Sequence, residues 1–174
     1  MPTTAQYNTK WGRPNVGNSL QVDKTWYAAN IVKLALPWDM VLYTTDGPAV
    51  HTITVHRLAA PHFLTAFNAV WTAAQANCKL HPGLTTRQNL HSFGGDVFSG
   101  AWNLRYTRGY EAQGILSPHS WGIAIDIDAS ENPMGNPLRT TFPAWYVNAW
   151  KSAGFLWGGE FEGRKDSMHF QVSF

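Results

Sequence analysis

The sequence is poor in cysteine and in charged residues, and it has no long apolar run. Its one cysteine, Cys78, excludes an internal disulfide framework and a cysteine-rich structural zinc site. Only 14% of its residues are charged, the net charge is +2 and no run of Lys or Arg occurs, so nucleic-acid binding has little support. No apolar stretch approaches the roughly 20 residues that cross a bilayer. These absences leave a globular protein without a membrane span.

A secretory signal is also missing, because no basic start precedes an apolar stretch and a small-residue cleavage site. If the target lies outside the cytoplasm, we expect another factor to release the protein to it. With 174 residues and 44% hydrophobic content, the chain is long enough for one buried core and too short for two ordinary domains. We therefore predict a single domain over residues 1–174, acting as a monomer.

Hydrophobic patterning in the first half predicts few regular elements. Residues 1–45 are polar and interrupted by Pro and Gly, which favours an irregular N-terminal wrap with a short strand near Met40–Thr44. The alternation in Val50–His56 predicts a strand. A helix is expected from Pro61 to about Asn77, with one apolar face. The residues of that face are Phe63, Phe67, Val70 and Ala74.

Patterning in the second half predicts the strands that matter most. Ala101–Thr107 has the composition of a strand, and Gly122–Asp128 places three isoleucines on one face and small or acidic residues on the other. A helix is expected over Pro143–Ser152 and a final alternating strand over Met168–Phe174. Because helices and strands are segregated, we predict an α+β fold with a mostly antiparallel sheet and a few packed helices.

Two histidines differ from the others because each has an aspartate at a short fixed offset. His119 precedes the strand that carries Asp126, and His169 lies on the polar face of the last strand. If these strands are neighbours, two imidazoles and one carboxylate can bind a zinc ion and leave a fourth position open, as in catalytic sites. The remaining histidines are interpreted as ordinary core or surface residues: His51, His56, His62, His81 and His91.

The residues next to this group suggest the rest of a hydrolytic site. Asp166, three positions before His169, is the candidate general base, although a turn-forming Asp is the alternative. Arg105 is the candidate for holding the charge that develops on the carbonyl oxygen. Arg108 is a second candidate for that role and Arg87 a weaker third.

The pattern Ser117-x-His119-x-x-Gly122-x-Ala124-x-Asp126, followed by Asp166-x-x-His169, resembles the LAS metallopeptidases of peptidase family M15. Residues 97–174 carry the likeness and would form the zinc-site core of a fold shared with Hedgehog-type domains. The resemblance implies that His119, Asp126 and His169 bind one Zn²⁺ and that Asp166 is the base. It places Arg105 as the substrate-polarising arginine, and Ser117, Arg108 and Trp157 are expected to support the site or the substrate.

The resemblance implies a peptidoglycan peptidase acting on the peptide stem of the bacterial wall. We favour an L-alanyl-D-glutamate endopeptidase of the phage-lysin type, made in the host cytoplasm and released to the wall or periplasm. A D-alanyl-D-alanine carboxypeptidase is the alternative within the family. Two alternatives lie outside it: a non-catalytic, zinc-stabilised wall-binding module, and a Cys-His hydrolase built on Cys78. The second is disfavoured because Cys78 falls at a predicted helix C-terminus.

Overall fold

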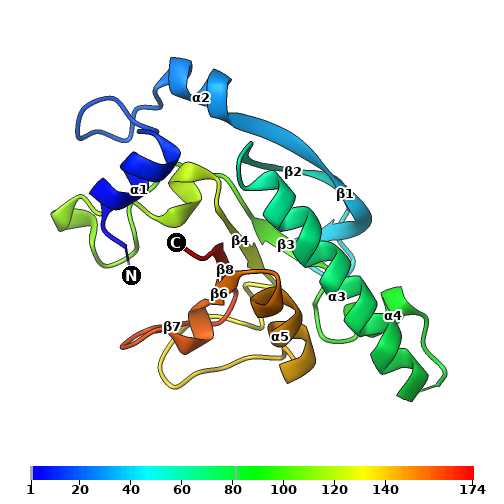
Figure 1. The fold of residues 1–174 in the computed structure, drawn as a ribbon. Coiled ribbons are helices and arrows are strands. Elements are labelled where there is room, and N and C mark those ends of the chain that lie inside the picture. The colour runs from blue at the N-terminus through cyan, green and yellow to red at the C-terminus, as the bar shows by residue number, and fades with distance from the viewer. Residues whose placement is uncertain (1, 81) are drawn as a thin grey trace.

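A six-stranded sheet with the order β2-β1-β3-β4-β8-β6 organises the computed structural model, which describes residues 2–80 and 82–174 (Figure 1). Every neighbouring pair in it is antiparallel except β1 and β3. The predicted α+β class and mostly antiparallel sheet are therefore confirmed. The strands of this sheet are β1 (Ile31–Leu42), β2 (Ala49–His56), β3 (Val97–Gly100), β4 (Ala124–Ile127), β6 (Phe155–Trp157) and β8 (His169–Val172).

The neighbouring strands β4 and β8 follow the predicted alternation closely. In β4, Ile125 and Ile127 are fully buried, and Asp126 between them faces the opposite side. In β8, Phe170 is fully buried and Val172 is 3% exposed. Ile125 pairs with Phe170 in register, so one face of this ladder is apolar throughout.

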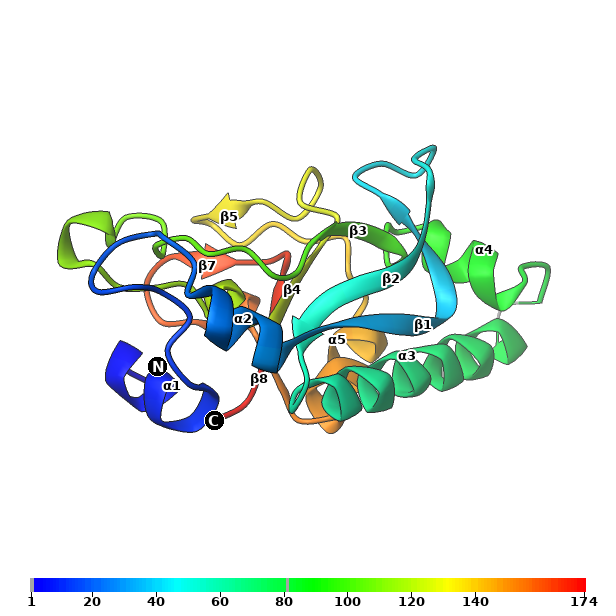
Figure 2. The same cartoon turned by 90° about the horizontal axis from the view of Figure 1, so that it is seen from above.

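Two helices, α3 (Ala60–Leu80) and α5 (Ala144–Ser152), lie together on one side of the sheet and pack against this apolar face (Figure 2). The predicted face of α3 is fully buried at all four positions. Phe67 of α3 packs edge-on against Trp150 of α5, which stacks on Phe170 at 5.1 Å. Aromatic packing of this kind adds to the area buried. The opposite face of β4 and β8 is thereby left for polar residues.

The first 45 residues are more regular than the sequence analysis predicts. They form α1 (Thr4–Trp11), α2 (Lys24–Asn30) and the twelve-residue β1, where only a short strand was expected. Thr3 and Gln6 form a capping box that begins α1. Pro37 and the charged residues of β1 interrupt its hydrophobic alternation, so the sequence pattern does not predict this strand. The strand is stabilised by its pairing with β2 and β3.

The prediction of a strand over Ala101–Thr107 is wrong, because the strand β3 ends at Gly100. Residues 101–107 run beside residues 115–120 and are held there by scattered bonds. The amide of Asn103 donates to the carbonyl of His119, and Tyr106 forms an isolated bridge with Leu116. A side chain, that of Ser120, accepts from the amide of Arg105 at 3.1 Å. The segment is extended without belonging to a sheet ladder.

Shorter elements complete the described residues. The strands β5 (Met134–Gly135) and β7 (Lys165–Asp166) form a separate two-stranded sheet. The remaining helices are α4 (Thr86–His91) and the 3-10 turns η1 (Glu111–Gln113), η2 (Pro118–Trp121) and η3 (Gly158–Glu160). Among the described residues no helix has the length and apolarity needed to cross a bilayer. His81 lies outside the described residues.

Candidate metal centre

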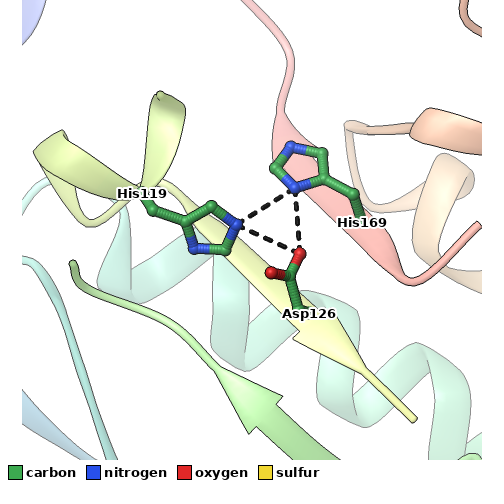
Figure 3. A group of neighbouring side chains, drawn as sticks. All are labelled: His119, Asp126 and His169. Atoms are coloured by element: carbon green, nitrogen blue, oxygen red, sulfur yellow. Dashed lines mark hydrogen bonds and ion pairs between the residues drawn. The ribbon is translucent and has the colours of Figure 1, made fainter. Parts of the chain in front are cut away.

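Three side chains from three elements meet on the polar face of the sheet (Figure 3). His119 comes from η2, Asp126 from β4 and His169 from β8. Asp126 and His169 are register partners on adjacent strands, which places their side chains next to each other on one face. Nε2 of His119 lies 3.1 Å from both Asp126 Oδ1 and His169 Nδ1, and these last two atoms are 3.0 Å apart.

Local sequence explains how His119 reaches this point. Pro118 opens the short turn η2, and the hydroxyl of Ser117 accepts from the His119 amide at 3.4 Å. The turn ends at Gly122, whose φ of +68° is left-handed. A Cβ there would lie 2.7 Å from the amide nitrogen of His56, so the site also requires a residue without a side chain. Ser117 therefore caps the turn that carries His119.

When the two imidazoles are neutral, the hydrogen bonds on their outer sides favour one proton position on each ring. Nδ1 of His119 lies 2.5 Å from the carbonyl oxygen of Ala101, which can only accept. Nε2 of His169 lies 3.0 Å from Oε1 of Gln171. Each neutral ring therefore donates outward and turns its lone pair toward Asp126. Three lone-pair atoms facing one point fit a cation, and the N₂O donor set suits zinc.

The charges of the cluster reinforce one another. Burial raises the pKa of Asp126, but the charges and hydrogen bonds of His119 and His169 outweigh it and hold that pKa well below its usual range. Burial lowers the pKa of His169, but the hydrogen bond and charge of Asp126 dominate and raise it. A carboxylate that stays ionised is suited to binding a metal. The same negative charge attracts a proton to His169, so a metal competes with that proton for the ring.

Arg105 points into this cluster. Its Nη2 lies 3.5 Å from Oδ2 of Asp126, the carboxylate oxygen that does not face the histidines. The backbone of Arg105 is fixed by Ser120, whose hydroxyl accepts from its amide and donates to its carbonyl at 2.9 Å. One third of the Arg105 side chain is exposed. The guanidinium is therefore accessible to a ligand beside the three converging side chains (the metal group).

Asp166 lies in β7 and is mostly buried near the same cluster. Burial raises its pKa above the usual value, while the charge of His169 acts against that rise. The charge of Asp126 also raises this pKa, and the charges of His119 and Arg105 lower it. Its Oδ1 is buried and has no hydrogen-bond partner among the described residues. A buried carboxylate oxygen without a donor is available to accept a proton from a bound water.

The turn that follows Asp166 is held by the segment at the end of β6. Nε1 of Trp157 donates to the carbonyl of Ser167 at 2.8 Å, and its ring lies over Phe170. The next residue, Gly158, lies close to the backbone of Asp166. A Cβ added to Gly158 would lie 2.3 Å from the carbonyl oxygen of Asp166. Trp157 thus supports the site through the backbone between Asp166 and His169.

Two adjoining cavities lie beside the cluster. The first, of about 360 Å³, is lined by His119 and Asp126, by β2 and β3 and by the segment that follows β3. The second, of about 460 Å³, contains the exposed Arg108. Asn103 and Arg105 line both cavities, so the two cavities adjoin at these residues. Cys78, near the end of α3, lines neither cavity.

Several residues that shape the site were missed by sequence reasoning. Gln171 had a signal, because it follows His169 on the same face of an alternating strand. Gly158 stood in a conspicuous Trp-Gly-Gly run but had no role assigned. Ser120 and Tyr7 had no local signal, since their partners are brought to them only by the fold.

Comparison with known proteins agrees with this geometry. Residues 111–172 match the model of a family described as D-alanyl-D-alanine carboxypeptidase, which belongs to the M15 peptidases. The matched segment contains the three residues of the metal group together with Asp166 and Trp157. No solved structure matches the chain.

Proposed function

We propose that this chain is a zinc-dependent peptidase of the M15 type that hydrolyses an amide bond in the peptide stem of peptidoglycan. The observation that carries the proposal is the convergence of His119 Nε2, Asp126 Oδ1 and His169 Nδ1, with both outer ring nitrogens already bonded elsewhere. When bound there, zinc supplies a Lewis acid that polarises a carbonyl group and makes water acidic near neutral pH.

The remaining residues divide the chemistry between them. Asp166 accepts the proton of the attacking water and returns it to the departing amine nitrogen, for which its raised pKa is well matched. Arg105 stabilises the negative charge that develops on the carbonyl oxygen. Ser120 holds the backbone of Arg105, and Ser117 caps the turn of His119. None of the supporting residues needs to act as a nucleophile.

Within this class we favour an L-alanyl-D-glutamate endopeptidase. The two cavities that share Arg105 and Asn103 support this choice, since a stem that continues past the cleaved bond needs room on both sides. The activity after which the matched family is described favours the second candidate, a D-alanyl-D-alanine carboxypeptidase. That enzyme would require space mainly on one side of the bond.

Mass spectrometry of purified muropeptides after digestion separates these candidates. New N-terminal D-glutamate supports the endopeptidase, whereas release of free D-alanine identifies the carboxypeptidase. A parallel digestion with chelator tests metal dependence, and survival of activity under chelation contradicts the proposal.

The variant Asp166→Asn separates an enzyme from a zinc-stabilised wall-binding module. It keeps the size of the side chain and removes the proton acceptor, so we expect loss of about 10²–10⁴-fold in kcat, the usual contribution of a general base. Zinc content should stay at the wild-type value. If the zinc-loaded wild-type protein binds cell walls and never cleaves them, the binding module is the correct interpretation.

A further inference from the structure

The N-terminal helix α1 reaches the metal group through one tyrosine. Tyr7, only 3% exposed, accepts a hydrogen bond on its hydroxyl from Nε2 of Gln171 at 3.0 Å. Gln171 is 1% exposed, and its Oε1 accepts from Nε2 of His169, also at 3.0 Å. A continuous path of two hydrogen bonds thus connects the first helix to a candidate metal ligand.

The ring of Tyr7 also touches the element that carries the other histidine. It stacks on Trp121 of η2, two residues after His119, with the ring centroids 4.9 Å apart. Nε1 of Trp121 in turn donates to the carbonyl of Gly12, at the end of α1. Tyr7 is therefore packed against both histidine-bearing segments, although it lies outside the part of the chain that matches the peptidase family.

The direction of the Gln171 amide decides which tautomer of His169 is favoured. In the orientation present, the amide oxygen faces His169 and leaves the proton on Nε2, so the Nδ1 lone pair is available to a metal. Rotated by half a turn, the amide would offer an N–H to Nε2 and favour the proton on Nδ1, the atom needed for binding. In the first orientation the Tyr7 hydroxyl accepts from the amide nitrogen, and without that hydroxyl the buried N–H would have no partner.

We propose that Tyr7 is a positioning residue for the metal site: its hydroxyl orients Gln171, and Gln171 keeps His169 ready to bind zinc through Nδ1. This inference rests on the proposed function, because it assumes that zinc is the ion bound. It assigns to α1 (Thr4–Trp11) a part in metal affinity rather than in packing alone. Outer-sphere partners of metal-bound histidines typically change affinity by about 10–100-fold.

The test measures Zn²⁺ affinity of the full-length protein by competition with a chromophoric chelator. We expect Tyr7→Phe to weaken binding by about tenfold or more. The matched control is Tyr146→Phe, which removes the hydroxyl of another buried tyrosine, one that donates to the carbonyl of Gly95 and not to Gln171. The control should lose folding stability and keep wild-type zinc affinity.

A rescue experiment separates orientation from general loosening. A carboxylate in place of the Gln171 amide has only acceptor oxygens, so it needs no partner to choose its orientation. We expect Gln171→Glu to make zinc affinity independent of Tyr7, with the double variant within about twofold of Gln171→Glu alone. Co²⁺ absorption should change in Tyr7→Phe and be equal in the two Gln171→Glu proteins.

The outcomes distinguish the two proposals. If the wild-type protein binds no zinc, the proposed function fails. If the wild type binds one zinc ion and Tyr7→Phe binds it equally well, only the role of Tyr7 fails. The same conclusion follows if Tyr7→Phe costs as much affinity with Gln171→Glu as without it.

Discussion

Replacing Gly158 with alanine should disable the enzyme while leaving its metal site intact. A Cβ at this position would lie 2.3 Å from the carbonyl oxygen of Asp166 and 2.9 Å from its Cβ, where ordinary contact begins near 3.4 Å. The first neighbour is backbone, so the strand that carries Asp166 has to move by about 1 Å to restore contact distance. Misplacement of a catalytic group by that amount costs about 10²-fold in rate.

The assay compares kcat/KM on a defined stem peptide with zinc affinity in the same preparation. We expect Gly158→Ala to lose about 100-fold in kcat/KM and to bind zinc as the wild type does, because Asp166 is not one of the three residues that we propose as metal ligands. Gly135→Ala is the matched control. Gly135 pairs with Lys165, next to Asp166, and a Cβ there meets nothing within 4 Å. A folded, zinc-loaded Gly158→Ala protein with wild-type activity would refute this account of Asp166.

Two further predictions concern Arg105 and His56. Ser120→Ala removes the hydroxyl that fixes the Arg105 backbone, and should lower kcat by about tenfold, which corresponds to about 1.4 kcal/mol of barrier, with zinc affinity unchanged; an equal loss of zinc affinity would contradict it. Burial lowers the pKa of His56, whose Nδ1 accepts from the amide of Leu58. As pH falls below about 6.5 the unfolded chain takes up the proton first, so folding stability decreases toward acid. Urea unfolding in excess chelator measures the free energy of unfolding at each pH. Below about pH 6.5, this free energy should decrease less in His56→Gln than in the wild type, by up to about 1.4 kcal/mol per pH unit. Equal pH dependence of the two proteins would contradict this role of His56.

The parts of the fold that could be predicted are those with a short sequence period. Ile123, Ile125 and Ile127 alternate with smaller or acidic residues, and this pattern alone places Asp126 on the polar face. The apolar spacing of α3 is equally local. The convergence of His119, Asp126 and His169 could be predicted because the motif resembles a known family, and the register of β4 with β8 supplies its physical basis.

The parts that could not be predicted depend on contacts distant in sequence. The long strand β1 is stabilised by β2 on one side and β3 on the other, so its own composition conceals it. Residues 101–107 have strand composition, but the amide of Arg105 donates to the hydroxyl of Ser120 and not to a neighbouring strand. Tyr7 and Gln171 are 164 positions apart, and no local pattern connects them. The capping box of Thr3 and Gln6 was a readable signal for α1 that the composition of the region obscured.

The position of β8 has a consequence for the order of folding. This strand follows all of its neighbours along the chain, yet it sits between β4 and β6 inside the sheet. Contacts of such long sequence separation are slow to form, because loop-closure entropy opposes them. Pairing of residues 169–172 with β4 and β6 joins these strands into one sheet, and the same pairing brings His169 to His119 and Asp126. A nascent or partly folded chain therefore cannot assemble the site before its sheet has closed.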